Sequence, residues 1–278
     1  MIREEIDFVK LNPTQNMTVL VTGNKSYESY KEIAAEVMAY DHVHAEQVGF
    51  IEKPGNEKAD ARLQMAGDEF CGNACMSLAA FIAIEKELEG ENELFLEVSG
   101  SECLIKCRVT KHEDQYCCEV NLPLPEKIKA ETIVYEKEEL EIVIVSYSGF
   151  LHIVVEVDQF NEKMKRKGQA LARLLGLSSD RKLIGILFYN PQTKELLPLI
   201  YVPKLDSMVW ERGCGSGAAS IGACLAWKNK TRVAAAIKQP GGSIKTTANY
   251  ENGRITSLSI KGSVELVAKG KAFVDITK

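Results

Sequence analysis

Residues 70–83 read FCGNACMSLAAFIA and residues 213–226 read GCGSGAASIGACLA, so two similar segments lie about half the chain apart. Aligned without gaps, Cys71 matches Cys214, and a glycine follows each cysteine. Chance similarity between two helices rich in small residues is the alternative. Because cysteine and glycine match at the same end of both segments, the sequence predicts two similar halves that each carry one copy.

Each copy begins with small residues and continues into a run rich in Ala, Leu and Ile. This pattern indicates a buried helix whose N-terminus lies at the Cys-Gly pair. The same register pairs Ser77 with Ser220. Two further helices are expected at 27–39 and 161–175, the second with its lysines and arginines facing solvent.

Short strand-like runs separated by Gly, Pro and Asn surround both helices. They are 17–21, 94–98, 103–109, 116–120, 142–145, 153–157, 184–188, 199–202, 243–246, 255–260 and 263–268. We therefore expect an α+β fold with two pseudo-symmetric halves, each a curled β-sheet or barrel around a central helix. The break at 121–125, Asn-Leu-Pro-Leu-Pro, predicts an N-terminal half at 1–120 and a C-terminal half at 121–267, with the tail, 268–278, returning to the first half.

Composition excludes several classes of protein. The chain has 278 residues, 45% hydrophobic and 26% charged, with a net charge of −5, which is typical of a globular protein. A mildly acidic chain is not expected to bind nucleic acid or an anionic membrane, because both partners are negatively charged as well. The longest apolar run, near 142–145, is too short to span a bilayer. The first residues do not resemble a signal peptide, so we expect a cytoplasmic protein.

The eight cysteines are expected to be thiols, because a reducing compartment disfavours disulfides. They form no C-x-x-C pair, and the four histidines lack the usual spacing of zinc ligands, so no metal is expected. The matched register of Cys71 and Cys214 favours a function for these two. The other six are expected to be small buried residues: Cys75, Cys103, Cys107, Cys117, Cys118 and Cys224.

A cysteine at a helix N-terminus is expected to have a lowered pKa, because the helix dipole stabilises its thiolate. The first-turn N–H groups at Gly72, Asn73, Gly215 and Ser216 can bind a carboxylate. If the halves face each other across a pseudo-twofold axis, both sets of donors would hold one carboxylate with a sulfur on each side. That arrangement suits removing a proton from one face of a carbon and returning it on the other.

This reaction matches the chemistry of an amino acid. The Cα–H is a very weak acid, and N–H donors at the carboxylate stabilise the charge that develops when the proton leaves. One thiolate would act as base and the opposing thiol as acid, with the roles exchanged in the reverse direction. Exclusion of water strengthens both interactions. Neither pyridoxal phosphate nor a metal is required.

At these residues the sequence resembles the diaminopimelate epimerase superfamily of cofactor-independent, two-cysteine racemases and epimerases. Residues 71–74 look like its first cysteine motif, residues 214–218 match its second, C-G-S-G-A, and residues 240–242 match its P-G-G. The resemblance covers nearly the whole chain. It implies two pseudo-symmetric barrels with the active site between them, no cofactor, a small-molecule amino-acid substrate and a homodimer.

The substrate is expected to differ from diaminopimelate. The asparagines, glutamate and arginine that bind its distal end in the epimerases correspond to positions near Met65, at Phe150, at Leu183 and at 201–203. Their amide and guanidinium donors are absent there. A pocket without those donors cannot pair a second carboxylate.

The sequence is more similar to the histidine racemase branch that serves staphylopine-type opine metallophore biosynthesis. The similar segments are 16–18, 46–52, 69–74, 219–222 and 239–244. This resemblance implies interconversion of L- and D-histidine; diaminopimelate or another amino acid is the alternative substrate.

Further substrate-binding residues follow from both lines of reasoning. Asn16 matches the superfamily's early asparagine near the substrate, and Gln47 matches a glutamine in the same region. Glu46 and Glu211 are candidates to accept hydrogen bonds from the substrate ammonium or imidazole, with solvated carboxylates as the alternative. Glu211 lies three residues before Cys214, which favours function there, whereas Glu46 is left open.

His152 could orient a thiol or contact the substrate, and a structural histidine is an equal alternative. Two readings compete with a racemase. One is a non-catalytic or isomerase relative of the phenazine-biosynthesis type, which the presence of both cysteines disfavours. The other is a redox sensor that forms a Cys71–Cys214 disulfide.

Overall fold

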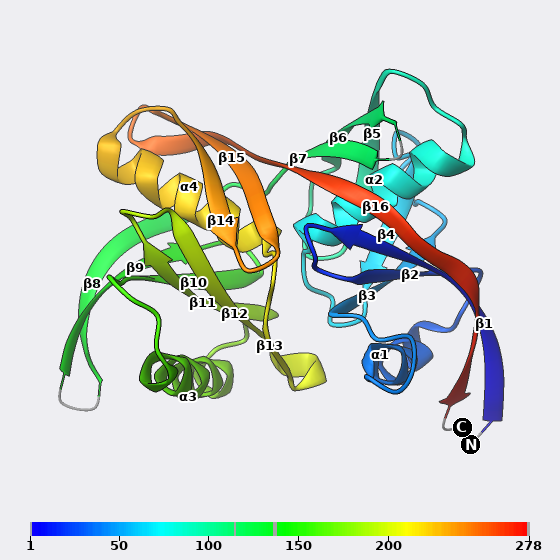
Figure 1. The fold of residues 1–278 in the computed structure, drawn as a ribbon, viewed down its shortest axis with the longest axis horizontal. Helices are drawn as coiled ribbons and strands as arrows, with labels where there is room; N and C mark the ends of the chain where they lie inside the picture. Colours follow the sequence, from blue (N-terminus) through cyan, green and yellow to red (C-terminus); the bar gives the residue numbers. More distant parts are fainter. Residues whose placement is uncertain (1, 114, 136–137, 277–278) are drawn as a thin grey trace. The chain divides into compact units, whose positions relative to one another are not determined.

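The structure, a computed structural model, describes residues 2–113, 115–135 and 138–276. The chain forms two compact units, Met1–Asn121 with Lys261–Lys278, and Leu122–Ile260 (Figure 1). The segment that rejoins the first unit therefore starts at Lys261, earlier than the expected 268. The reason is that β16 (Arg254–Ile276) is one continuous strand, which replaces the two short strands expected at 255–260 and 263–268.

The first unit consists of β-strands with two α-helices between them. Its elements are β1 (Ile2–Pro13), β2 (Thr18–Thr22), the 3-10 turn η1 (Tyr27–Ser29), α1 (Tyr30–Met38), β3 (Gln47–Glu52), β4 (Ala61–Met65), α2 (Gly72–Glu85), β5 (Glu91–Val98), β6 (Ile105–His112) and β7 (Gln115–Asn121). Strands β2 and β3, joined through α1, are parallel, and so are β4 and β5, joined through α2. The C-terminal part of β16 pairs antiparallel with β1.

The second unit repeats this order. Its elements are β8 (Lys127–Tyr135), β9 (Glu138–Ser146), β10 (Phe150–Glu156), α3 (Glu162–Ser178), β11 (Leu183–Asn190), β12 (Glu195–Val202), the 3-10 turn η2 (Pro203–Leu205), β13 (Ser207–Trp210), α4 (Gly215–Asn229), β14 (Val233–Gln239) and β15 (Gly242–Glu251). Strands β10 and β11 are parallel across α3, and β12 and β14 are parallel across α4. The shared order of parallel and antiparallel pairs confirms the two pseudo-symmetric halves.

The two cysteine-bearing helices are the cores of their units. Helix α2 is buried along most of its length and packs against β1, β2, β6 and β7, while α4 packs against β10, β11, β14 and β15. Small side chains allow this close approach. A Cβ at Gly222 would lie 2.6 Å from Thr246 Oγ1 on β15, so only glycine fits there. The expected central helix in a curled sheet is confirmed in both units.

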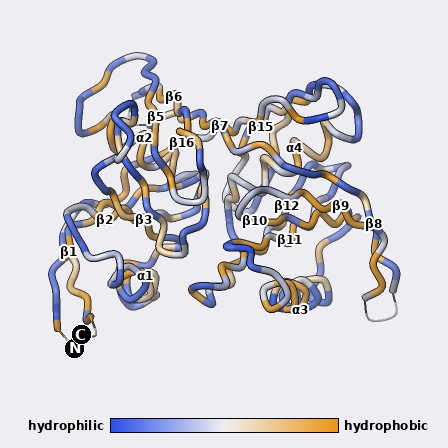
Figure 2. The backbone as a smooth tube through the Cα atoms, turned by 180° about the vertical axis from the view of Figure 1, so that it is seen from behind, coloured by the Kyte–Doolittle hydropathy of each residue, from blue (hydrophilic) through white to orange (hydrophobic). Residues whose placement is uncertain are grey.

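Helix α3 has the predicted amphipathic pattern, which Figure 2 shows as alternating hydrophilic and hydrophobic colours. Asn161 caps its N-terminus by accepting a hydrogen bond from the Met164 N–H at 2.9 Å. Gly168 and Ala172 lie on the buried face, where a Cβ at Gly168 would be 2.9 Å from the Phe188 ring.

Within the described residues, no helix is long and apolar enough to cross a bilayer.

Six of the described strands, β1, β3, β4, β8, β13 and β14, were not expected from the sequence. Strand β1 buries Ile6, Val9 and Leu11 but presents charged residues on its other positions, and its register with β16 shifts between Lys10 and Leu11. Strand β1 pairs with β2 on one side and with β16 on the other, so this shift is an irregularity within a paired strand. The charged positions and the shift obscure the regular alternation that identifies a strand in a sequence.

Candidate active site

Cys71 is the N-cap of α2, at the position predicted from the Cys-Gly pair. Its backbone is extended, with φ −131° and ψ 110°, and its side chain turns back over the first turn. The sulfur accepts a hydrogen bond from the Ala74 N–H at 3.4 Å, and the Cys71 carbonyl accepts the Cys75 N–H at 3.1 Å. The half-buried sulfur therefore replaces the oxygen of an ordinary N-cap residue.

The Cys71 thiol donates a hydrogen bond of 2.8 Å to Gln47 Oε1. Gln47 Nε2 in turn donates to Asn16 Oδ1 and to Thr18 Oγ1, both at 2.7 Å. The Thr18 hydroxyl donates its proton to the Asn16 carbonyl at 3.2 Å. Its oxygen can therefore act only as an acceptor toward Gln47. This acceptor holds the amide nitrogen of Gln47 on the Thr18 side and the amide oxygen toward Cys71.

The structure thus brings three predicted site residues, Asn16, Gln47 and Cys71, into one network. Thr18 completes it and was missed as a site residue. It starts β2 two residues after Asn16, and side chains two residues apart on a strand lie on the same face. Asn16 and Thr18 are fully buried, so their hydrogen bonds within the protein are not exchanged for water. The network gives Cys71 a fixed orientation.

Cys214 repeats the cap at the N-terminus of α4. Its backbone is extended, with φ −100° and ψ 111°. The sulfur accepts the Gly217 N–H at 3.3 Å, and the Cys214 carbonyl accepts the Ala218 N–H at 3.0 Å. A third contact of 3.6 Å joins the sulfur to Ser216 Oγ. The two cysteines therefore make the same cap with the residue three positions further along the chain.

The expected lowering of the cysteine pKa is wrong for Cys214. Burial raises the pKa of the Cys214 thiol well above its ordinary value, and the charge and hydrogen bond of the Glu211 side chain raise it further. The Ser216 hydroxyl and the Gly217 N–H act in the opposite direction but do not outweigh these effects. A buried site next to a carboxylate disfavours a second negative charge, so the thiol is the favoured form.

Segments from elsewhere in each unit hold the two cysteines in place. In the second unit, Gln239 Oε1 accepts the Cys214 N–H at 2.6 Å, while its Nε2 donates to the Cys214 carbonyl at 3.2 Å. In the first unit, Ser99 Oγ donates to the Glu69 carbonyl at 2.8 Å. Gln239 ends β14, and Ser99 follows β5, the corresponding strand. Both residues were missed as supports of the site, because the contacts join segments distant in sequence.

The remaining helix-end residues lie where they were expected. Gly72 and Asn73 occupy the first turn of α2, and Gly215 and Ser216 occupy the first turn of α4, all four of them buried. The first-turn N–H groups of a helix have no partner within the helix, and the sulfur takes one of them in each case. Their role toward a carboxylate stays a prediction.

Glu46 lies just before Gln47 and β3, half-buried, and its backbone N–H donates to the Met17 carbonyl at 2.8 Å. This hydrogen bond places Glu46 beside the segment that carries Asn16. Its role toward the substrate also stays a prediction.

The structural role considered for His152 is the one that the geometry favours. The side chain is fully buried on β10, and its Nδ1 shares a hydrogen bond of 2.7 Å with Ser220 Oγ on α4, which also bonds to the Tyr147 hydroxyl at 2.8 Å. In the register of the parallel strands, His152 lies beside Gly185 as Leu20 lies beside Gly49 in the first unit. His152 therefore occupies the position in the second unit that buried Leu20 occupies in the first.

We expect the His152→Leu variant to lose part of the acid sensitivity of the protein. Burial lowers the pKa of His152 from 6.5 to about 3, so below pH 6.5 the unfolded chain binds a proton that the folded protein excludes. The free energy of unfolding falls from this cause by up to about 1.4 kcal/mol per pH unit. Urea unfolding between about pH 4 and pH 6 should show a shallower slope in the variant, by about one proton. Equal slopes would mean that folded His152 is protonated.

The other cysteines divide by burial. Cys75, Cys107, Cys118 and Cys224 are buried as expected, and burial raises the pKa of each thiol, that of Cys224 to about 11. Cys103 is exposed and Cys117 is half-buried, so the expectation of burial is wrong for these two. Cys103 precedes β6 in a loop rather than lying on a strand, and loops run over the surface.

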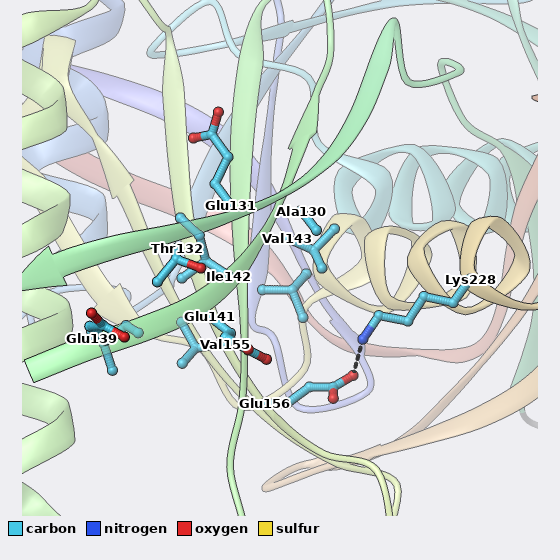
Figure 3. A pocket seen from close by; sticks show the side chains of 12 residues that line it. Ala130, Glu131, Thr132, Glu139, Glu141, Ile142, Val143, Val155, Glu156 and Lys228 are labelled. Atoms are coloured by element: carbon cyan, nitrogen blue, oxygen red, sulfur yellow. Dashed lines mark hydrogen bonds and ion pairs between the residues drawn. The ribbon is translucent and has the colours of Figure 1, made fainter.

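A cavity of about 620 Å³ in the second unit lies among β8, β9, β10 and the end of α4 (Figure 3). The charged residues that line it are Glu131, Glu139, Glu141, Glu156 and Lys228. Lys228 Nζ forms an ion pair of 2.6 Å with Glu156 Oε1. Lys228 is in the last turn of α4, at the end opposite Cys214, and no predicted site residue lines the cavity. We therefore do not assign the active site to it.

The repeated topology and the paired cysteine caps define the class of two-halved amino-acid racemases and epimerases. A hydroxyproline epimerase from Agrobacterium vitis has a TM-score of 0.71 to this chain at 12% identity, covering 98% of this chain and 93% of that one. A PhzF-family phenazine biosynthesis protein from Bacillus anthracis has a TM-score of 0.70 at 14% identity, covering 96% and 99%. At these identities the similarity shows the fold.

Sequence comparison resolves the family within this class. Residues 5–273 match the family described as the histidine racemase CntK N-terminal domain. A histidine racemase of Staphylococcus aureus is 36% identical and covers 99% of this chain and 100% of its own length. A histidine racemase of Fusobacterium nucleatum is 29% identical over 97% of both chains. The chain belongs to the histidine racemase family, and it is an isomerase.

Proposed function

We propose that this protein interconverts L- and D-histidine by moving the Cα proton between the thiols of Cys71 and Cys214, without a cofactor. The observation that carries the proposal is the pair of caps: each sulfur accepts the N–H three residues along its helix, at 3.4 Å and 3.3 Å. One deprotonated thiol removes the proton and the other thiol returns one on the opposite face. The family membership supports histidine as the substrate.

The rest of the binding site in the proposal uses the predicted residues. The first-turn N–H groups at the two helix N-termini bind the substrate carboxylate and stabilise the charge that develops as Cα loses its proton. Glu46 and Glu211 supply carboxylates for the ammonium and the imidazole. Asn16 and Gln47 hold Cys71 in place through the hydrogen bonds of 2.7 Å and 2.8 Å described above.

The location, the oligomeric state and the pathway of the enzyme are a further part of the proposal. We propose a cytoplasmic homodimer whose D-histidine feeds the biosynthesis of an opine metallophore. The resemblance to the histidine racemase branch that serves staphylopine-type biosynthesis supports this part of the proposal. Sedimentation velocity of the purified protein tests the dimer. A species of the mass of one chain, 30.8 kDa, at micromolar concentration would contradict it.

Incubation with L-amino acids in deuterated water tests the reaction and the substrate together. We expect histidine to gain deuterium at Cα and to become racemic without added pyridoxal phosphate, because the returned proton comes from a thiol that exchanges with solvent. Chiral chromatography with mass spectrometry measures both changes. Turnover of diaminopimelate but not of histidine would overturn the substrate, and no exchange with any amino acid would overturn the reaction.

A further inference from the structure

The hydrogen bonds around Cys71 form a chain that starts at a backbone carbonyl and ends at the sulfur. The Thr18 hydroxyl donates to the Asn16 carbonyl at 3.2 Å. Gln47 Nε2 donates to Thr18 Oγ1 at 2.7 Å, and the Cys71 thiol donates to Gln47 Oε1 at 2.8 Å. We propose that Thr18 is a positioning residue, which fixes the amide of Gln47 so that Cys71 rests as the protonated thiol and serves as the acid. This inference rests on the proposed function.

The direction of the chain is set by an atom that cannot donate. A backbone carbonyl only accepts, so the Thr18 hydroxyl gives its proton to Asn16 and its oxygen accepts from Gln47. The group that faces Thr18 is therefore the Gln47 nitrogen. This nitrogen also donates to Asn16 Oδ1 at 2.7 Å, so both of its hydrogens are used. The amide oxygen is the atom left to face the sulfur, and it can only accept.

An accepting oxygen at the sulfur favours the thiol over the thiolate. The S–H group satisfies Gln47 Oε1, whereas a thiolate would bring a negative charge to 2.8 Å from the partial negative charge of that oxygen. Rotating the amide by half a turn would direct its N–H groups at the sulfur, but its oxygen would then face the accepting oxygen of Thr18. Thr18 is fully buried, so water cannot compensate for that loss. The chain therefore opposes removal of the proton from Cys71.

The corresponding pair of residues in the second unit is apolar. Thr18 on β2 pairs with Gln47 on β3 across parallel strands. At the same register of the second unit, Phe150 on β10 pairs with Leu183 on β11. Both residues are buried, and neither side chain carries a hydrogen-bonding atom. The two capping cysteines therefore share the geometry of their caps but differ at this pair, which makes Cys71 the thiol whose proton is held by an amide.

The titratable groups around Cys71 stay in place when Thr18 is replaced. Those on the adjoining segments are Glu46, Asp68 and Glu69. Among the described residues, the buried thiols on α2 and on the strands that pack against it are Cys75, Cys107 and Cys118. Burial raises the pKa of these three thiols, so they are neutral at neutral pH. A change in the protonation of Cys71 in a Thr18 variant can therefore be attributed to the amide of Gln47.

The test is the rate at which iodoacetamide alkylates Cys71, followed by peptide mass spectrometry, in wild-type protein, Thr18→Val and Thr18→Ser. Only the thiolate reacts, so in wild type the rate should rise by about tenfold per pH unit near neutrality. Valine has the shape of threonine but offers no acceptor, so the amide can turn its N–H groups toward the sulfur. We expect Thr18→Val to react about tenfold faster at pH 7, with its profile about one pH unit lower, and Thr18→Ser to match wild type.

The matched control is Thr246→Val. Thr246 is a buried residue of β15, in the other unit, and its hydroxyl also donates to a backbone carbonyl at 3.2 Å, that of Ser259. The variant loses the same kind of hydrogen bond and should keep the wild-type alkylation profile of Cys71. Alkylation of Thr18→Val that is no faster than that of wild type would overturn the inference, and so would an equal acceleration in Thr246→Val.

A second measurement detects the proton directly and needs no Thr18 variant. The infrared difference spectrum between wild type and Cys71→Ser at neutral pH should contain one S–H stretching band, moved to lower frequency by the hydrogen bond to Gln47. Serine is a preferred N-cap residue, so α2 should still begin at the same place. Absence of the band would mean that Cys71 rests as a thiolate, which would refute the inference even if Thr18→Val does not fold.

Enzyme assays separate this inference from the proposed function. With Cys71 as the acid, kcat/KM for histidine should fall on the alkaline side, and Thr18→Val should move this fall about one pH unit lower. Faster alkylation of Thr18→Val in a protein that exchanges no Cα–H would overturn the proposed function and still support the role of Thr18. Racemisation by a wild-type enzyme whose Cys71 is alkylated at a rate independent of pH would support the function and contradict that role.

Discussion

Replacement of either proposed catalytic thiol, Cys71→Ala or Cys214→Ala, is expected to reduce the racemisation of histidine by at least about 1000-fold. Each variant lacks one of the two groups that exchange a proton with Cα, and positioned acid–base groups contribute about 10²–10⁴-fold in rate. Both caps are made by the sulfur and the backbone, so each variant also loses an N-cap worth about 1 kcal/mol. Chiral chromatography measures the remaining activity.

The two variants should still differ in a way that a folding defect cannot imitate. With one thiol left, the enzyme can remove and return the Cα proton on the same face, so each variant should exchange deuterium into one enantiomer without inverting it. Opposite enantiomers exchanging in the two variants would support the two-face mechanism; near-normal racemisation in either would refute it.

Cys75→Ala and Cys224→Ala are the matched controls, since both thiols lie further along the same helices. Neither thiol is the N-cap of its helix, so neither is expected to act as a base. We expect near-wild-type racemisation from both variants, with a modest loss of stability from the small cavities left behind.

Gly100→Ala is expected to lower the free energy of unfolding by about 3–4 kcal/mol. Gly100 has a left-handed φ of +73°, and a Cβ there would lie 2.4 Å from the backbone nitrogen of Phe70 and 2.8 Å from the carbonyl carbon of Glu69. Backbone atoms cannot move aside as a flexible side chain would, so the segment before Cys71 has to shift. Activity should therefore fall together with stability, which urea unfolding and the racemisation assay measure.

Gly90→Ala separates the backbone strain from the steric overlap. Gly90 has a similar φ of +69°, but no atom lies within 4 Å of the position of its Cβ. The variant should lose only the cost of the left-handed conformation, about 1 kcal/mol, and keep its activity. A loss at Gly100 no greater than that at Gly90 would contradict the close approach to Phe70.

Much of the site could be predicted because its main features are local. A cysteine before glycine at the start of a helix caps its own first turn, so Cys71 and Cys214 identified both helix starts. The internal repeat predicted that the helix and the cysteine cap of the first half would recur in the second half. Strands such as β1, β3 and β4 and the supports at Ser99 and Gln239 could not be predicted, because they depend on which distant segments lie side by side.

The amino-acid sequence by itself determined that there are two halves, that each has a buried helix capped by a cysteine, and that the chain is an isomerase. These properties follow from spacing within single turns and from the internal repeat. The tertiary structure decided how the two thiols differ. Burial and Glu211 raise the pKa of Cys214, the oriented amide of Gln47 holds the proton of Cys71, and His152 fills a core position. The reason is that burial and orientation are set by contacts between segments far apart in the chain.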